Sequence, residues 1–156
     1  MERFNLPVFI FSTATPYGSL PLCVLILSDE GHETLVAAFS KVRDAGLQFK
    51  NVMTDDCAPL RNALKATWPN CNLLLCTWHY CQSWWTWILD SKHGIKSTER
   101  QMTMNKITSL IYEKNRGKIT DKFDELLKIE NLKLTKKLEN NLKRISEWNH
   151  SYRGNF

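Results

Sequence analysis

The chain has 156 residues, of which 43% are hydrophobic and 24% are charged, a composition typical of a globular domain rather than of a disordered or repetitive chain. Its longest apolar run, from Leu20 to Leu27, is far shorter than the roughly 20 residues of a membrane-spanning helix, and no signal peptide is recognisable. Five cysteines, an odd number without a secretion signal, argue against a disulfide framework and favour free thiols in a reducing compartment.

The net charge of +5 is unevenly distributed. Residues 1–91 carry 6 Lys/Arg and 8 Asp/Glu, whereas residues 92–156 carry 15 Lys/Arg and 8 Asp/Glu. A basic second half favours an anionic partner, and nucleic acid in particular. The alternative is a solvated, lysine-rich helical surface, since acidic residues are interleaved with the basic ones in this half.

The first half of the chain predicts an alternation of strands and helices. Apolar segments rich in Val, Ile and Phe predict two strands joined by a turn-rich connection at 13–19, and the nearly continuous apolarity of the second strand predicts burial on both faces. In chain order, the expected elements are strands at 7–12 and 22–28, a helix at 33–45, a strand at 49–54, a helix at 56–67, a strand at 72–76 and a helix at 77–90. This order implies a parallel sheet flanked by helices.

From about residue 92 the pattern is helical throughout. Thr98 and Gln101 predict a capping box at the start of one helix, which Gly117 ends. A later series of apolar residues at steps of three and four predicts one helix that continues to Trp148. The chain is therefore expected to divide into an α/β region at residues 1–91 and a basic, all-helical region in its remainder.

Two adjacent carboxylates, Asp55 and Asp56, follow the strand predicted at 49–54. In open α/β sheets, ligands bind at the carboxyl ends of the strands. A carboxylate in that position can hold Mg²⁺, and two such ions about 4 Å apart support phosphodiester chemistry. The plainer alternative makes Asp56 a helix N-cap and Asp55 an ordinary loop acid.

A cysteine and a histidine, Cys76 and His79, lie where the last predicted strand meets its helix, and Cys71 and Cys81 are close in sequence. Cys and His are zinc ligands, and structural zinc typically takes four of them. The spacing differs from that of the usual zinc fingers, so buried free cysteine is the alternative. A Cys–His nucleophile pair is disfavoured because no third, orienting residue is evident.

Four tryptophans, Trp78, Trp84, Trp85 and Trp87, lie on the helix predicted at 77–90. Aromatic side chains can stack on unpaired bases. Packing in a core or an interface is the favoured role here, because the spacing of Trp78 and Trp85 places both on one face of a helix.

Several segments, in this order and spacing, resemble the core of the MULE (Mutator-like element) transposase domain. The family typically has a strand that ends in Thr-Asp, a helix with Asn-Ala-Ile/Leu, an aromatic-Pro pair and a strand that ends in Cys-x-Trp-His. The corresponding segments here are FKNVMTDD at 49–56, LRNAL at 60–64, TWPN at 67–70 and LLLCTWH at 73–79. Residues 7–90 are covered by the resemblance.

The resemblance implies a fold and a catalytic site. The family carries a DDE triad of carboxylates that binds Mg²⁺ or Mn²⁺ on a ribonuclease-H-like fold, and Asp55 matches the second triad position. The first carboxylate is expected upstream of Met1, on a first strand that this incomplete domain lacks. The third, a glutamate, is expected after a helical insertion that residues 92–156 resemble, and residues 152–155 resemble the segment before it. Cys76 and His79 match a family feature between the second and third positions.

The expected function is thus that of a portion of a nuclear, cut-and-paste DNA transposase, which cleaves and joins phosphodiester bonds on transposon ends but is inactive alone. One alternative is a domesticated descendant that serves as a DNA-binding or regulatory protein, and another is a helical module that binds a partner protein. The resemblance also implies an open sheet edge at the position of the first strand, which invites self-association.

Overall fold

The computed structural model describes residues 5–153. The chain forms two compact units, which we call the first unit, Met1–Val52 with Cys57–Leu73, and the second unit, Met53–Asp56 with Leu74–Phe156. Each unit therefore combines two separate stretches of chain. The predicted division near residue 92 into a transposase core and an insertion stays a prediction.

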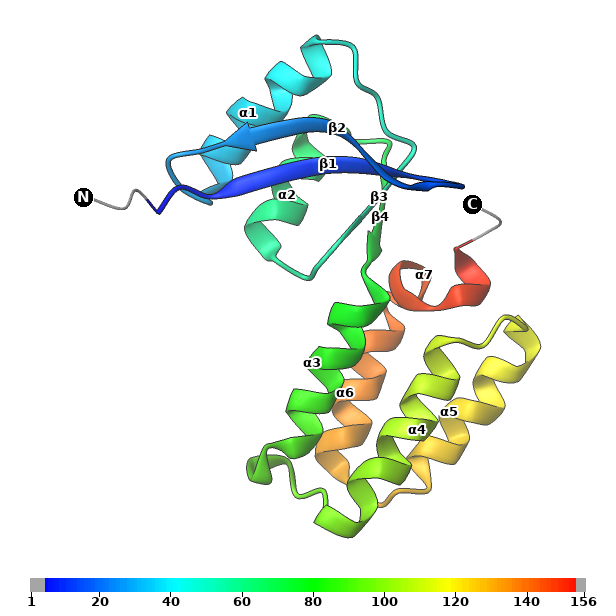
Figure 1. The fold of residues 1–156 in the computed structure, drawn as a ribbon. Helices are drawn as coiled ribbons and strands as arrows, with labels where there is room; N and C mark the ends of the chain where they lie inside the picture. The colour runs from blue at the N-terminus through cyan, green and yellow to red at the C-terminus, as the bar shows by residue number, and fades with distance from the viewer. Residues whose placement is uncertain (1–4, 154–156) are drawn as a thin grey trace. The chain divides into compact units, whose positions relative to one another are not determined.

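An antiparallel hairpin opens the first unit, with β1 at Val8–Thr15 and β2 at Gly18–Ile26 (Figure 1). The strands extend through most of the connection predicted at 13–19, because Thr15 stabilises a short turn. Its hydroxyl donates to the carbonyl of Gly18 at 2.8 Å and accepts from the amide of Tyr17 at 3.3 Å. Gly18 has a φ of +130°, which a residue with a side chain rarely adopts.

The two faces of the hairpin differ in exposure, which corrects the prediction that β2 is buried on both. Phe9, Phe11, Cys23 and Leu25 pack against the core of the first unit. The alternate side chains remain exposed; they are Val8, Ile10, Val24 and Ile26, at 56%, 61%, 55% and 65%. Side chains alternate between the faces of a strand, and the first-unit core covers only one face of this hairpin.

Two helices, α1 at His32–Asp44 and α2 at Ala58–Thr67, complete the first unit. The core is strongly aromatic: the ring of Phe11 lies 5.3 Å from that of Phe39 and is stacked on Phe49 at 5.2 Å. Trp68 closes this group, and its indole nitrogen donates to the carbonyl of Leu47 at 3.1 Å. Edge and stacked aromatic contacts of this kind add to the burial of apolar area.

Two short strands, β3 at Asn51–Thr54 and β4 at Asn72–Leu75, pair with each other. The amide of Asn72 donates to the carbonyl of Lys50 at 2.9 Å, and that of Cys76 donates to Thr54 at 2.7 Å. The donor moves forward from Asn72 to Cys76 as the acceptor moves forward from Lys50 to Thr54, so the two strands run parallel. The mixed α/β class is confirmed, whereas the ribonuclease-H-like arrangement stays a prediction.

The second unit is mostly helical (Figure 1). Its helices are α3 at Thr77–Leu89, α4 at Arg100–Ile111, α5 at Ile119–Leu127, α6 at Leu132–Leu142 and α7 at Ile145–Trp148. Their shared core contains Trp84, Ile107, Leu126 and Leu134, all of which are almost fully buried. No helix within residues 5–153 has both the length and the apolar character that crossing a membrane requires.

Two predictions for this unit are wrong in detail. The single helix expected to run to Trp148 is interrupted, because Arg144 leaves the helical conformation at φ −117° and ψ 24°. The expected capping box is absent from the described start of α4: Glu99 is the N-cap and makes no side-chain cap bond. The Gln101 amide instead donates to Asn105 at 2.9 Å, one turn further along the helix.

Candidate functional site

The end of the β3–β4 strand pair carries the predicted carboxylate Asp55. This residue follows the last residue of β3, and the hydroxyl of Thr54 donates to its Oδ1 at 3.3 Å. The Cys76 amide bonds to the Thr54 carbonyl, so the ends of both strands lie together. Asp55 is half-buried. The structure thus places this carboxylate where ligands bind in open α/β sheets.

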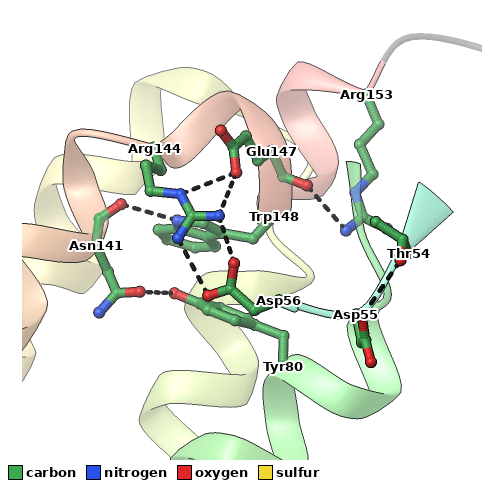
Figure 2. A network of polar contacts seen from close by, with 9 residues as sticks. All are labelled: Thr54, Asp55, Asp56, Tyr80, Asn141, Arg144, Glu147, Trp148 and Arg153. Carbon is green, nitrogen blue, oxygen red and sulfur yellow. Dashed lines mark hydrogen bonds and ion pairs between the residues drawn. The ribbon is translucent and has the colours of Figure 1, made fainter. Parts of the chain in front are cut away.

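The neighbouring carboxylate, Asp56, forms a bidentate ion pair with Arg144 (Figure 2). Arg144 donates from Nη2 to Oδ1 at 2.7 Å and from Nη1 to Oδ2 at 3.1 Å, and it also binds Glu147 at 2.7 Å. Asp56 first, and then Glu147, raise the pKa of Arg144 above its usual value. The alternative role of Asp56 as an N-cap is wrong, because α2 begins at Ala58 with Cys57 as its N-cap.

A layer of polar and aromatic contacts supports the residues before Arg144 (Figure 2). Asn141 Oδ1 accepts from the Tyr80 hydroxyl at 2.8 Å, and its carbonyl accepts from the Trp148 indole at 2.9 Å. The rings of Tyr80 and Trp148 stack at 5.3 Å. Burial raises the pKa of Tyr80, so its hydroxyl remains a hydrogen-bond donor. These contacts hold the turn from which Arg144 reaches Asp56.

Arg153 connects the C-terminal part of the described chain to the same strand ends. Its guanidinium donates to the hydroxyl of Thr77 at 2.8 Å and to the carbonyl of Leu75, the last residue of β4. Nε2 of His150 lies 3.2 Å from the same hydroxyl. Burial, followed by the positive charges of Arg153 and Lys114, lowers the pKa of His150.

The two possible zinc ligands lie at the start of α3. Cys76 is its N-cap and is half-buried, whereas His79 is exposed, with its ring 4.7 Å from that of Trp78. Among residues 5–153, no group of three or more His, Cys, Asp or Glu side chains is placed to hold a metal ion. All five cysteines are free. The zinc site at Cys76 and His79 stays a prediction.

The tryptophans of α3 have two different environments. Trp84 is 1% exposed in the core of the second unit, as packing predicts, and Trp87 packs against this core. Trp78 is 65% exposed, so it does not pack in the core of the second unit, and its packing in an interface stays a prediction. It lines a shallow surface depression together with Trp85 and Gln101.

One region of the second unit therefore contains both candidate site residues that the sequence predicted and residues whose contacts it did not predict. Asp55 and Cys76 are brought together by the pairing of β3 and β4. The contacts of Arg144 with Asp56 and of Arg153 with Thr77 were not predicted from the sequence, because these partners lie more than 70 positions away in the chain. The local signal available was the spacing of Arg144 and Glu147, which suits an ion pair on one helical turn. Residues 154–155, part of the segment predicted to precede a glutamate, lie outside the described residues.

Comparison with known proteins extends these observations. A scan of protein families matches residues 1–83 to the MULE transposase domain, which is more than half of the 156-residue chain. The match includes β3, β4 and about the first two turns of α3, with Asp55, Cys76 and His79. A search of curated proteins found no significant match. The chain belongs to the MULE transposase domain family.

Proposed function

We propose that the chain contributes to the catalytic core of a DDE-type DNA transposase, with Asp55 as one of its metal-binding carboxylates. Membership of the family assigns a transposase-related function. The observation that carries the finer proposal is the position of Asp55, half-buried at the end of β3 beside the end of β4. Carboxylate oxygens are the ligands that Mg²⁺ prefers.

The carboxylate next to Asp55, that of Asp56, is engaged in an ion pair. The carboxylate of Asp56 is bound through both oxygens by Arg144, whose positive charge opposes a cation in the same place. Mg²⁺ or Mn²⁺ at Asp55 would activate the attacking water and stabilise the leaving oxygen during phosphodiester cleavage. Asp55 would hold the ion, while the Arg144–Asp56 pair fixes the backbone next to it.

Paramagnetic broadening of backbone amide signals by Mn²⁺ tests this role and detects weak binding. We expect Mn²⁺ to broaden the signals around residues 54–56, and Asp55→Asn to remove the effect. The matched control, Asp56→Asn, removes an equal charge from the adjacent residue and should retain most of the broadening. Unchanged broadening in Asp55→Asn, or none in the unmodified chain, would contradict the metal role.

We further propose that residues 1–156 alone do not catalyse transposition. One carboxylate cannot hold two metal ions between strongly charged phosphates. The purified chain is therefore expected to show neither cleavage nor strand transfer on DNA with Mg²⁺ or Mn²⁺. Measurable activity that Asp55→Ala abolishes would overturn this expectation.

DNA is the proposed partner, and the nucleus is the proposed location because the family acts on chromosomal DNA. Anisotropy of labelled DNA at increasing salt concentration measures the interaction. A steep fall in affinity is expected, because basic residues release counterions from the phosphates. Absent or salt-insensitive binding would contradict a DNA role and favour a protein partner.

We also propose self-association through the exposed face of the hairpin, with a second copy of the chain as the occupant. Residues 5–28 include no charged side chain, so two identical faces meet without repulsion. An exposed apolar patch of this kind marks a site of association with another protein surface. Light scattering should show dimers that Ile10→Lys disrupts, whereas Tyr17→Lys, at the fully exposed turn, should leave them intact. A monomer at all concentrations would refute this proposal.

A further inference from the structure

Two loops of the second unit are built together into one surface, which we call the two-loop surface and define as residues 112–118 and 149–153. Asn149 is fully buried, and its amide donates to the carbonyl of Leu110, at the end of α4, at 2.7 Å. Its side-chain oxygen accepts from the amide and the hydroxyl of Ser151 at 2.9 and 2.6 Å. A buried asparagine with three side-chain hydrogen bonds holds the second loop against the end of α4, directly before the first loop.

Aromatic rings on this surface are held outward by neighbouring side chains. The guanidinium of Arg116 lies 4.3 Å from the centre of the Tyr152 ring and donates to the carbonyl of Ser151 at 3.2 Å. The ring of Tyr112 lies 4.6 Å from that of His150. Tyr112 is nevertheless 50% exposed, and Tyr152 is 37% exposed. These rings are therefore ordered at the surface without being part of the core.

The same surface carries a concentration of positive charge. Lys114, Arg116 and Lys118 are exposed, and within the described chain none of them pairs with a carboxylate. The one acid of the two loops, Glu113, binds Lys122 at 2.8 Å. The hydrogen bond from Lys122 is the main cause that lowers the pKa of Glu113 to about 2. Its charge is thus neutralised by a lysine outside the surface.

The two-loop surface continues to the strand end that carries Asp55. His150 and Arg153 both contact the hydroxyl of Thr77, and Arg153 also binds the carbonyl at the end of β4. On the neighbouring strand, the carbonyl of Thr54, which precedes Asp55, accepts from the amide of Cys76 directly after β4. Figure 2 shows Arg153 and Asp55 at this end of the strand pair. The two-loop surface is therefore connected to the candidate catalytic carboxylate through the ends of β4 and β3.

We propose that the two-loop surface binds the sugar–phosphate backbone of the DNA on which Asp55 acts, an inference that rests on the proposed function. Lys114, Arg116 and Lys118 contact phosphates, because exposed Lys and Arg side chains bind phosphate oxygens of DNA. Tyr112 packs against a sugar or an unpaired base, as exposed aromatic residues do in single-strand grooves. Ordered rings interleaved with cations suit a nucleic acid better than an acidic peptide, which offers charges without flat bases.

The test compares two charge-matched double variants of the whole chain. Lys114→Ala with Lys118→Ala removes two cations from the surface. The control, Lys128→Ala with Lys136→Ala, removes two exposed lysines elsewhere in the second unit, of which Lys128 lies at the other end of α5. All four side chains are exposed, so thermal denaturation should show unchanged folding.

Affinity for labelled duplex and single-stranded DNA is measured across a salt series. The surface variant should reduce the slope of log affinity against log salt on duplex DNA by about 2, one for each lost phosphate contact. The control should leave the slope unchanged. Tyr112→Ala should weaken single-strand binding about fivefold or more, whereas Tyr112→Phe should retain it.

The outcomes separate this inference from the proposed function. Equal slopes for both double variants, with normal binding by the unmodified chain, would overturn the two-loop surface and leave the DNA role intact. A poly-glutamate peptide that binds the unmodified chain as tightly as DNA, with the same sensitivity to the surface variant, would also overturn it. Absence of DNA binding by the unmodified chain would remove the proposed function itself.

Discussion

The two units organise their interiors in different ways. The first unit is held by aromatic packing, with Phe11 in contact with Phe39, Phe49 and Trp68, and its exposed sheet face is uncharged. The second unit combines an apolar helical core with polar contacts near its strand ends, of which the bidentate pair of Arg144 is an example. The difference indicates that apolar packing provides most of the stability, while polar contacts set the positions of charged groups.

Removal of one large core ring, in either unit, should have the largest effect on stability. It tests whether apolar packing provides most of the stability of both units. Trp84→Ala and Phe39→Ala, both at buried positions, should each reduce the free energy of unfolding by about 3–5 kcal/mol. Urea denaturation measures the loss, and hydrogen exchange should show reduced protection mainly in the unit that carries the substitution. Equal loss of protection throughout the chain would show that the two units unfold as one.

A smaller effect is expected where the polar layer of the second unit is weakened. Tyr80→Phe removes the hydrogen bond to Asn141 while keeping the ring stacked on Trp148, and should cost about 1 kcal/mol. Tyr17→Phe, at a fully exposed position, is the matched control and should cost nothing measurable. Chemical denaturation of both variants makes the comparison, and equal stabilities would show that this bond contributes little.

The ion pair of Asp56 and Arg144 should contribute still less, about 1 kcal/mol or less, because both side chains are partly exposed, at 55% and 39%. A double-mutant cycle with Asp56→Asn and Arg144→Gln isolates the interaction from the separate contact of Arg144 with Glu147. Coupling well above this value would mean that the polar contacts stabilise the second unit as strongly as its core does.

The smallest effect concerns pH. The pKa of Glu113 is lowered to about 2, mainly by the hydrogen bond from Lys122. A carboxylate with a lowered pKa contributes stability that is present above its usual value near 4.5 and is lost as pH falls through about 2. NMR titration should find this low pKa, and Lys122→Ala should move it back toward the usual value. A normal pKa in the unmodified chain would contradict the ion pair.

Local patterns predicted what local forces determine. The order of strands and helices, and the position of Asp55 at a strand end, followed from apolar runs and helix breakers. The exposure of alternate residues in β2 did not, because it depends on which elements cover the hairpin. The pair between Arg144 and Asp56 also escaped prediction, since its partners are separated by 88 positions and no local pattern encodes such a contact.

The route of the chain through the two units has a practical consequence for mapping function by truncation. Met53–Asp56 belongs to the second unit, although the chain directly before and directly after this segment belongs to the first unit. A shortened polypeptide that begins at Leu74 would retain α3 to α7 but lose both adjacent carboxylates. Arg144 would then lose its contact with Asp56, so a loss of DNA binding in such a deletion could not be assigned to the residues removed before β3. Point substitutions in the whole chain, rather than deletions, are the appropriate way to dissect this protein.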